Sequence, residues 1–293
     1  TYFSKIVNKV ILANLEENDP NDYTYLFKFA DYLIRTEVLD KELLGVDILT
    51  TYIQKVGKSN ETFSNWMMSS DLIDYLIKSD LHVEVVKRIQ PIVKFCSKKQ
   101  KISLQMIEAL YDKAAVTHKS EIEPMYYLIV SAFKGFDNKT IIDFVQKHNS
   151  DNLFLSILME KAKNMDLLRY CVITLLKNES KGHLLSRLNK NIRAIIIEYV
   201  NQNFKSQNLT YLQEILPDLI STSKNAVKEF DEHINLIVRD YAGKEDTQEF
   251  VLLILKAYLV KTKGKTHLSI VITKQLFRCQ NDKLFTFIND LLD

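Results

Sequence analysis

Cysteine and histidine are the residue types in this sequence best suited to act as nucleophiles, bases or metal ligands. The three cysteines, Cys96, Cys171 and Cys279, lie far apart and form no C-x-x-C pair for zinc or redox chemistry. A cysteine nucleophile needs a thiolate stabilised by a nearby cation or base, whereas Cys96 falls on the apolar face of an expected helix. We therefore expect reduced, buried thiols and no catalytic residue in this chain.

The histidines and one glycine-lysine turn are candidates for a metal site and a phosphate site, respectively. No H-x-x-x-H or H-E-x-x-H pair occurs among the six histidines, which are His82, His118, His148, His183, His233 and His267. Gly264-Lys265-Thr266 is similar to the end of a P-loop, but the first glycine of that motif would have to be Leu259. The sequence predicts no bound metal and no cofactor.

The elements that would position any site are expected to be helices, because turn residues are scarce. The chain of 293 residues has 6 Gly and 4 Pro, where average usage would supply roughly 20 and 15. Sandwiches, barrels and Rossmann units need such residues for hairpins and phosphate loops. Lysine and arginine (39) nearly balance aspartate and glutamate (37), giving a formal charge of +2. This balance indicates no nucleic-acid partner.

Apolar residues recur at helical three-and-four spacing along most of the chain. A clear example is the set Leu81, Val85, Val86, Ile89, Ile92, Val93 and Cys96. About a dozen or more helices with short connections fit paired helices stacked in sequence better than one closed bundle. We predict an all-α, armadillo/HEAT-like α-solenoid of stacked helix pairs, with residues 1–293 forming a single segment.

Several helix starts can be read from capping residues. Ser103 and Asn138 are placed to cap the helices that follow them. Ser120-Glu121-Ile122-Glu123 has the S-x-x-E form of a capping box, with Pro124 expected in the first turn. We therefore predict a helix that begins at Ser120.

Clustered aromatic and basic residues have more than one interpretation. The aromatic residues near the start are expected to be mostly core, with some exposed if a terminal repeat lacks a neighbour; they are Tyr2, Phe3, Tyr23, Tyr25, Phe27, Phe29 and Tyr32. Lys98-Lys99-Gln100-Lys101 and Lys261-Thr262-Lys263-Gly264-Lys265 fall at expected helix ends. Lysines there either complement the helix dipole as solvated turns or dock an acidic partner.

A resemblance to a known family covers residues 60–136. The residues that carry it follow in order: Trp66-Met67, Asp71-Leu72-Ile73, Ser79-Asp80-Leu81-His82, Val86, Lys87-Arg88, Ile92-Val93-Lys94-Phe95, Ile102-Ser103-Leu104, Ile107, Leu110-Tyr111 and Thr117-His118-Lys119. This stretch resembles the helical N-terminal region of the large fat-facets-type ubiquitin-specific proteases. It departs from the family at Leu110-Tyr111, where an Ile-Trp pair is typical. It departs again at Val116-Thr117-His118-Lys119, which replaces a Gly-Lys-His-Glu turn and leaves Glu121 as the nearest acidic residue after the histidine.

The resemblance implies a noncatalytic part of a cysteine deubiquitinase, a ubiquitin carboxyl-terminal hydrolase. The family's nucleophile lies in an Asn-x-Gly-x-x-Cys box, and no glycine here has asparagine two residues before it. Hydrolysis would therefore belong to a domain elsewhere in the parent protein. Because the chain lacks an initiator methionine, we expect it to be a segment of a longer protein.

Three classes of function remain open: a noncatalytic deubiquitinase scaffold, a free-standing armadillo/HEAT-type adaptor in trafficking or transport, and an unrecognised helical enzyme. The scaffold would hold protein partners or ubiquitinated substrates, with His82, Arg88, His118 and Glu121 as candidate protein-binding residues. Structural capping is the alternative role for both histidines. No stretch approaches the ~20 apolar residues of a membrane span and no signal peptide is visible. We expect a cytoplasmic protein without membrane insertion.

Overall fold

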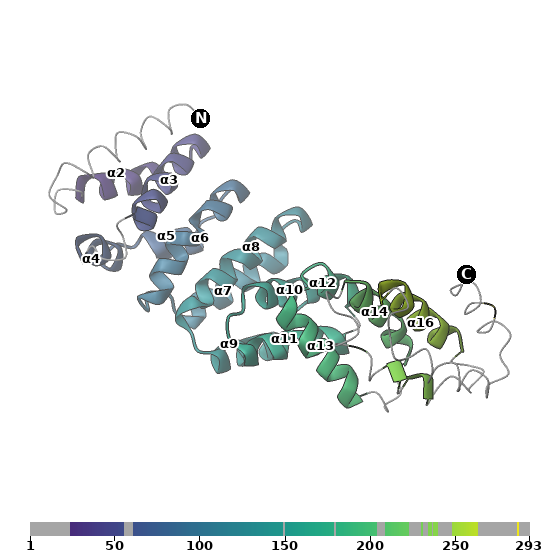
Figure 1. Cartoon of the computed structure of the whole chain (residues 1–293). Helices are drawn as coiled ribbons and strands as arrows, with labels where there is room; N and C mark the ends of the chain where they lie inside the picture. The colour runs from purple at the N-terminus through teal and green to yellow at the C-terminus, as the bar shows by residue number, and fades with distance from the viewer. Residues whose placement is uncertain are drawn as a thin grey trace. The chain divides into compact units, whose positions relative to one another are not determined.

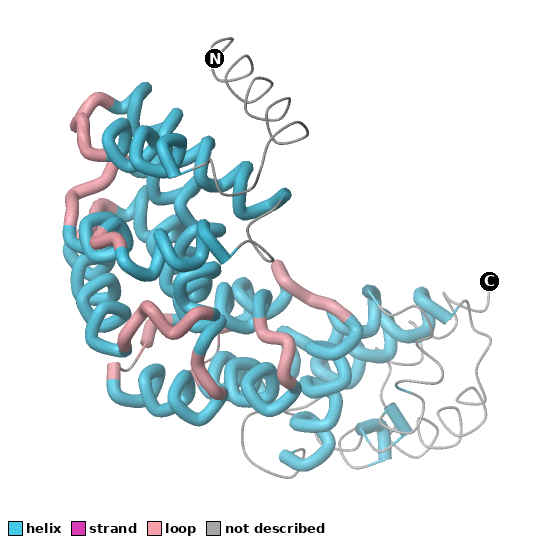
Figure 2. The backbone as a smooth tube through the Cα atoms, turned by 90° about the vertical axis from the view of Figure 1, so that its left-hand side faces the viewer, coloured by secondary structure: helices cyan, strands magenta, loops and turns pink. Residues whose placement is uncertain are grey.

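The computed structural model describes residues 24–55, 61–148, 150–178, 180–203, 209–222 and 248–262, together with a few single positions between 230 and 239 and at 286. Within these residues every regular element is a helix and no strand occurs (Figure 2). The prediction of an all-α protein is therefore confirmed for the described residues. The chain divides into two compact units, Thr1–Leu167 and Leu168–Asp293.

The first unit contains nine described α-helices and one 3-10 turn before the boundary. Figure 1 labels its helices from α2 to α10. They are α2 (Thr24–Ile34), α3 (Leu39–Lys55), α4 (Glu61–Ser69), α5 (Leu72–Lys78), α6 (Val83–Lys98), α7 (Leu104–Val116), α8 (Lys119–Ala132), η2 (Phe133–Gly135), α9 (Asn138–Lys147) and α10 (Asn152–Lys161). Helices α3, α6, α8 and α10 contact one another in that order, while α2 packs on α3 and α7 on α8. The first unit is thus built from packed helix pairs.

The second unit is built from the remaining described helices. Helix α11 (Met165–Lys177) crosses the boundary and is followed by α12 (Lys181–Leu185), α13 (Lys190–Asn203), α14 (Leu209–Thr222) and α16 (Gln248–Thr262). Helix α14 packs against α12 and α16. An ion pair joins Arg169 of α11 to Glu198 of α13 at 2.7 Å. The prediction of one segment over 1–293 stays a prediction.

The core follows the apolar faces expected from helical spacing. In α6, Val85, Ile89, Ile92, Val93 and Cys96 are all completely buried. This burial is the main stabilising contribution, because each large apolar side chain removed from water contributes about 1.5–3 kcal/mol.

An aromatic cluster closes the core of the first helices. The Phe27 ring lies edge-on to Tyr52 of α3 and Phe63 of α4, with ring centroids 4.8 and 4.9 Å apart. The Trp66 ring lies 5.2 Å from Phe27. Such pairs add about 0.5–1.5 kcal/mol each beyond the area that they bury.

The other aromatic residues of α2 do not enter this core. Tyr25, Phe29 and Tyr32 are 80%, 51% and 66% exposed. Their spacing of four and three places them on one side of the helix, away from Phe27. The prediction that these residues are mostly core is therefore wrong for α2, except at Phe27; Tyr2, Phe3 and Tyr23 lie outside the described residues.

The helix caps agree only in part with the sequence prediction. Ser103 caps α7 as expected, accepting a hydrogen bond from the Met106 N–H at 3.3 Å. Helix α9 is capped by Asp137 rather than Asn138, since the Asp137 carboxylate accepts from the Thr140 N–H at 2.9 Å. Helix α8 begins at Lys119 after the cap residue His118, so the predicted start at Ser120 is wrong.

A buried serine joins the C-terminal ends of α6 and α8. The Ser97 hydroxyl donates to the carbonyl of Ala132 and accepts from the N–H of Gly135, at 2.8 Å for the second bond. A Cβ atom on Gly135 would lie only 2.0 Å from the Ser97 carbonyl oxygen. Glycine is required here because the two backbones approach this closely.

Candidate functional site

Two of the four candidate protein-binding residues line one cavity of the first unit. The cavity has a volume of about 370 Å³ and opens between the α5–α6 turn and the α7–α8 turn. His82 lies in the α5–α6 turn, and Glu121 comes from the first helical turn of α8. The floor is apolar and is formed by Leu76, Ile77, Val86, Leu110, Met125 and Leu128. Because these residues come from four helices, packing of the helix pairs creates the site.

Both candidate histidines act as helix caps in the structure. The Nδ1 atom of His82 accepts a hydrogen bond from the Glu84 N–H at 3.2 Å at the start of α6. His118 does the same for α8, with Nδ1 3.4 Å from the Ser120 nitrogen and 2.8 Å from the Ser120 hydroxyl. The capping alternative is therefore confirmed for both residues. Both histidines are nevertheless exposed, and His82 lines the cavity.

Lys113 and Asp80 tie the two turns together across the cavity. The Lys113 ammonium donates to the Ser79 carbonyl and pairs with the Asp80 carboxylate at 2.9 Å. The hydrogen bond from Lys113, and then its charge, lower the pKa of Asp80. Asp80 is 99% exposed, so its carboxylate lies on the rim and faces water. The sequence alone does not reveal this pair, because its members lie on different helix pairs.

A second cavity shares the wall formed by Ser79, Asp80, Leu81 and His82. Its volume is about 530 Å³, and its other side includes Glu37, Glu42 and Tyr75. The α5–α6 turn therefore stands between two hollows along the edge of the first unit. Carboxylate and imidazole groups contribute to the lining of both cavities.

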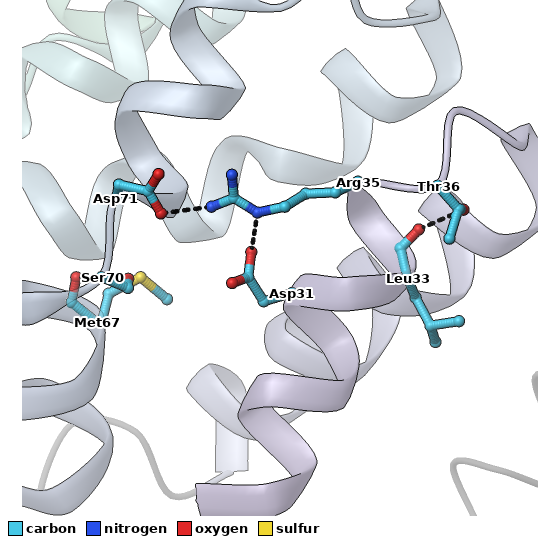
Figure 3. A network of polar contacts seen from close by, with 7 residues as sticks. All are labelled: Asp31, Leu33, Arg35, Thr36, Met67, Ser70 and Asp71. Carbon is cyan, nitrogen blue, oxygen red and sulfur yellow. Dashed lines mark hydrogen bonds and ion pairs between the residues drawn. The ribbon is translucent and has the colours of Figure 1, made fainter.

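Arg35 fixes the position of the neighbouring turns. Its guanidinium donates to Asp31 at 2.8 Å and to Asp71 at 2.6 Å, as Figure 3 shows. The same group lies 4.7 Å from the centre of the Tyr75 ring. Because Asp31 belongs to α2 and Asp71 precedes α5, this network joins the first helix pair to the next one. It holds the wall of the second cavity in place.

Arg88, the fourth candidate residue, lies apart from these cavities. Its guanidinium pairs with Asp47 of α3 at 2.9 Å, and its backbone carbonyl accepts a hydrogen bond from Thr50 at 3.4 Å. Arg88 therefore links α6 to α3, and it does not line the cavity that contains His82 and Glu121. The structure brings His82 and Glu121 to one cavity, places His118 at the cap of α8, and places Arg88 on an interhelical contact.

The two described cysteines are buried thiols with no sign of activation. Burial raises the pKa of Cys96 to about 12, against a smaller lowering by Lys101. Burial also raises the pKa of Cys171 to about 12. Both groups are therefore protonated thiols near neutral pH, which is unsuited to nucleophilic attack. Cys279 lies outside the described residues.

The most strongly shifted tyrosine belongs to the packing of α7, α8 and α10. Burial, followed by a hydrogen bond to Asp151, raises the pKa of Tyr126. The Asp151 carboxylate also caps α10 by accepting from the Phe154 N–H at 2.8 Å. Neither Tyr126 nor Asp151 lines the cavities described above. The shift therefore reflects a structural contact, and it does not favour the enzyme interpretation.

Comparison with known proteins identifies no relative of this chain. No family, curated protein or solved structure matches the chain. Within the part of the chain that the structure describes, no three His, Cys, Asp or Glu side chains are grouped to hold a metal ion. The described helices also include none with the length and apolar character needed to cross a membrane.

Proposed function

We propose that this chain is a noncatalytic protein-binding scaffold, and that it is the substrate-recognition segment of a cytoplasmic cysteine deubiquitinase. The observation that carries the proposal is the cavity between the α5–α6 and α7–α8 turns. Residues of the family-like stretch supply its rim and floor, among them Asp80, Leu81, His82, Leu110 and Thr117. The stretch that resembles the helical N-terminal region of the fat-facets-type proteases thus coincides with a polar-rimmed hollow.

The arrangement of helices supports an armadillo/HEAT-like α-solenoid. Helices α3, α6, α8 and α10 follow one another in contact, and α2 and α7 each pack on one of them. Stacking of helix pairs in this way produces extended surfaces suited to holding partner proteins. Small-angle scattering tests the solenoid, because a compact chain of this length would have a radius of gyration of roughly 19 Å. A larger value is expected, and a value at or below the compact one contradicts the solenoid.

Charge reversal on the cavity wall tests the binding site. We expect Glu121→Lys to abolish binding of a partner that the unmodified chain holds, because Glu121 lines the cavity without supporting its floor. Lys139→Glu, at an exposed position of α9, is the control and should leave binding intact. Retained binding by Glu121→Lys, with an unchanged circular dichroism spectrum, would place the recognition surface elsewhere.

The parent reading frame tests the deubiquitinase assignment. We expect it to encode an Asn-x-Gly-x-x-Cys box and a later histidine box downstream of residue 293. A frame without them contradicts the assignment and leaves the alternative, a free-standing armadillo/HEAT-type adaptor in trafficking or transport. The partners in both cases are proteins, with ubiquitinated substrates specific to the first.

A further inference from the structure

A groove with a lysine-rich rim lies on the first unit, distinct from the cavities at its turn edge. Its volume is about 620 Å³, and α3, α6, α8, η2 and α10 all contribute to it. Ile53, Pro91, Phe95 and Val130 form its apolar part. The rim carries Lys94, Lys98, Lys134 and Lys161. We call this feature the basic groove.

The rim lysines are only weakly neutralised by the rest of the protein. Among the described residues no carboxylate pairs with Lys94, Lys98 or Lys134. The Lys134 ammonium donates to the Lys161 carbonyl at 3.0 Å, a partner that carries no formal negative charge. Lys161 is the exception, since it contacts Glu160 at 2.5 Å. Burial, and then the charges of Lys94, Lys163, Lys161 and Lys98, lower the pKa of Lys134.

Helix ends account for only part of this cluster. A helix C-terminus carries roughly half a negative charge, so the three ends at α6, α8–η2 and α10 offset less than half of four ammonium charges. Adding Glu160 still leaves the rim positive. Lys94 also lies a full turn before the end of α6, where it is poorly placed to serve as a cap. The four rim lysines therefore carry more positive charge than the helix ends and Glu160 neutralise.

We propose that the basic groove binds an extended acidic peptide segment of a partner protein, with carboxylates on the lysine rim and an apolar side chain on the floor. Charge complementarity selects the acidic residues, and the recessed Phe95 and Val130 select the apolar one. The inference rests on the proposed protein-binding function and adds a second surface to it.

The lining of the groove favours a peptide over a nucleic acid. Its apolar part, formed by Ile53, Pro91, Phe95 and Val130, matches an apolar side chain, which a peptide carries and a phosphodiester backbone does not. The Lys161 ammonium lies 5.2 Å from the centre of the Tyr127 ring and covers one face of it, and Phe95 is only 7% exposed, so little aromatic surface is open for stacking on bases. Lysine pairs with carboxylates and phosphates alike, so the apolar part and the scarcity of open aromatic rings, rather than the lysines, favour the peptide.

The binding test uses the full chain and a fluorescein-labelled peptide of alternating glutamate and leucine. Fluorescence polarisation should show saturable binding that weakens as salt rises, because the contacts are ionic. The double variant Lys94→Ala/Lys98→Ala should bind at least tenfold more weakly. Both side chains are exposed on α6, so the variant is expected to fold. Lys119→Ala/Lys139→Ala removes the same charge from exposed sites outside the groove and should bind as the unmodified chain does.

Four results would overturn the proposal. They are an absence of binding to the peptide, equal binding of a peptide with glutamine in place of glutamate, equal loss in both double variants, and tighter binding of a single-stranded RNA that competes with the peptide. The Glu121→Lys variant separates the two surfaces. It should lose the partner held at the cavity and keep the peptide, so failure of the cavity assignment and failure of the groove give different results.

Discussion

The close approach of Gly135 to Ser97 makes a strong prediction about stability. In Gly135→Ala the new Cβ atom would lie 2.0 Å from the Ser97 carbonyl oxygen and 2.7 Å from the carbonyl carbon. Both are backbone atoms within α6, so neither can move aside as a flexible side chain would. The substitution must therefore displace η2 from the end of α6.

The cost has two parts that the structure separates. Forcing atoms into a packed interior costs about 1–3 kcal/mol. Displacing η2 also weakens the hydrogen bond from the Gly135 N–H to the Ser97 hydroxyl, and a lost bond of this kind costs about 1 kcal/mol. We expect Gly135→Ala to lower the free energy of unfolding by about 2–4 kcal/mol. Ser97→Ala, which removes the hydroxyl without a clash, should cost about 1–3 kcal/mol.

The single tryptophan provides a local assay. Trp66 lies in α4 against Phe27, within the first unit, so its fluorescence follows unfolding of the unit that contains Gly135. With a denaturant slope of about 2 kcal/mol/M in urea, the expected loss lowers the transition midpoint by about 1–2 M. Far-UV circular dichroism on the same samples follows the helices of both units.

Gly182 is the matched control. A Cβ atom at Gly182 meets nothing within 4 Å, and this residue lies in α12 of the second unit. Gly182→Ala should leave the Trp66 transition unchanged and stabilise its own helix by about 0.5–1 kcal/mol. An unchanged Trp66 midpoint in Gly135→Ala would refute the packing argument, because it would mean that α6 and η2 are not held this closely.

Three further predictions concern caps, thiols and acid. His118→Ala should destabilise the first unit by about 1 kcal/mol in Trp66-monitored unfolding while His118→Asn costs less; equal losses would contradict the capping role. A ubiquitin-derived electrophile should leave Cys96 and Cys171 unlabelled by mass spectrometry, since burial raises the pKa of each to about 12, and labelling of either would contradict this. Hydrogen bonds from the Thr140 N–H and hydroxyl lower the pKa of Asp137 below its ordinary value of 3.8. Its stabilisation is therefore complete above that value and is lost as pH falls through the lowered one, so Asp137→Asn should unfold with a weaker acid dependence than the unmodified chain.

The sequence predicted the helices better than their starts. Helical spacing identified the buried face of α6, because periodicity reports directly which side chains leave water. Ser103 was recognisable as a cap, since serine is a favoured residue there. The start of α8 was misplaced because histidine is not among the residues that usually cap a helix. At α9 the preceding Asp137 competes with Asn138, and local sequence does not decide between them.

The candidate site was visible from the sequence only as isolated residues. His82 and Glu121 share a cavity because α6 packs on α8, and no local pattern reports that contact. The same holds for Lys113 and Asp80. In the basic groove, Lys94 and Lys98 lie four residues apart on one helix face, which the sequence does show. Lys134 and Lys161 join them only through tertiary packing.

The capping geometry of the two histidines fixes what they can offer to a partner. At each one the Nδ1 lone pair is already used by a backbone N–H, so in the neutral ring the proton resides on Nε2. Each imidazole therefore presents a hydrogen-bond donor to an approaching molecule. Under the proposed protein-binding function, a segment that contacts either histidine must supply an acceptor, such as a main-chain carbonyl or a carboxylate. Replacing either histidine by aspartate would preserve the cap yet exchange a donor for an acceptor, so the same fold would then select a partner of opposite polarity.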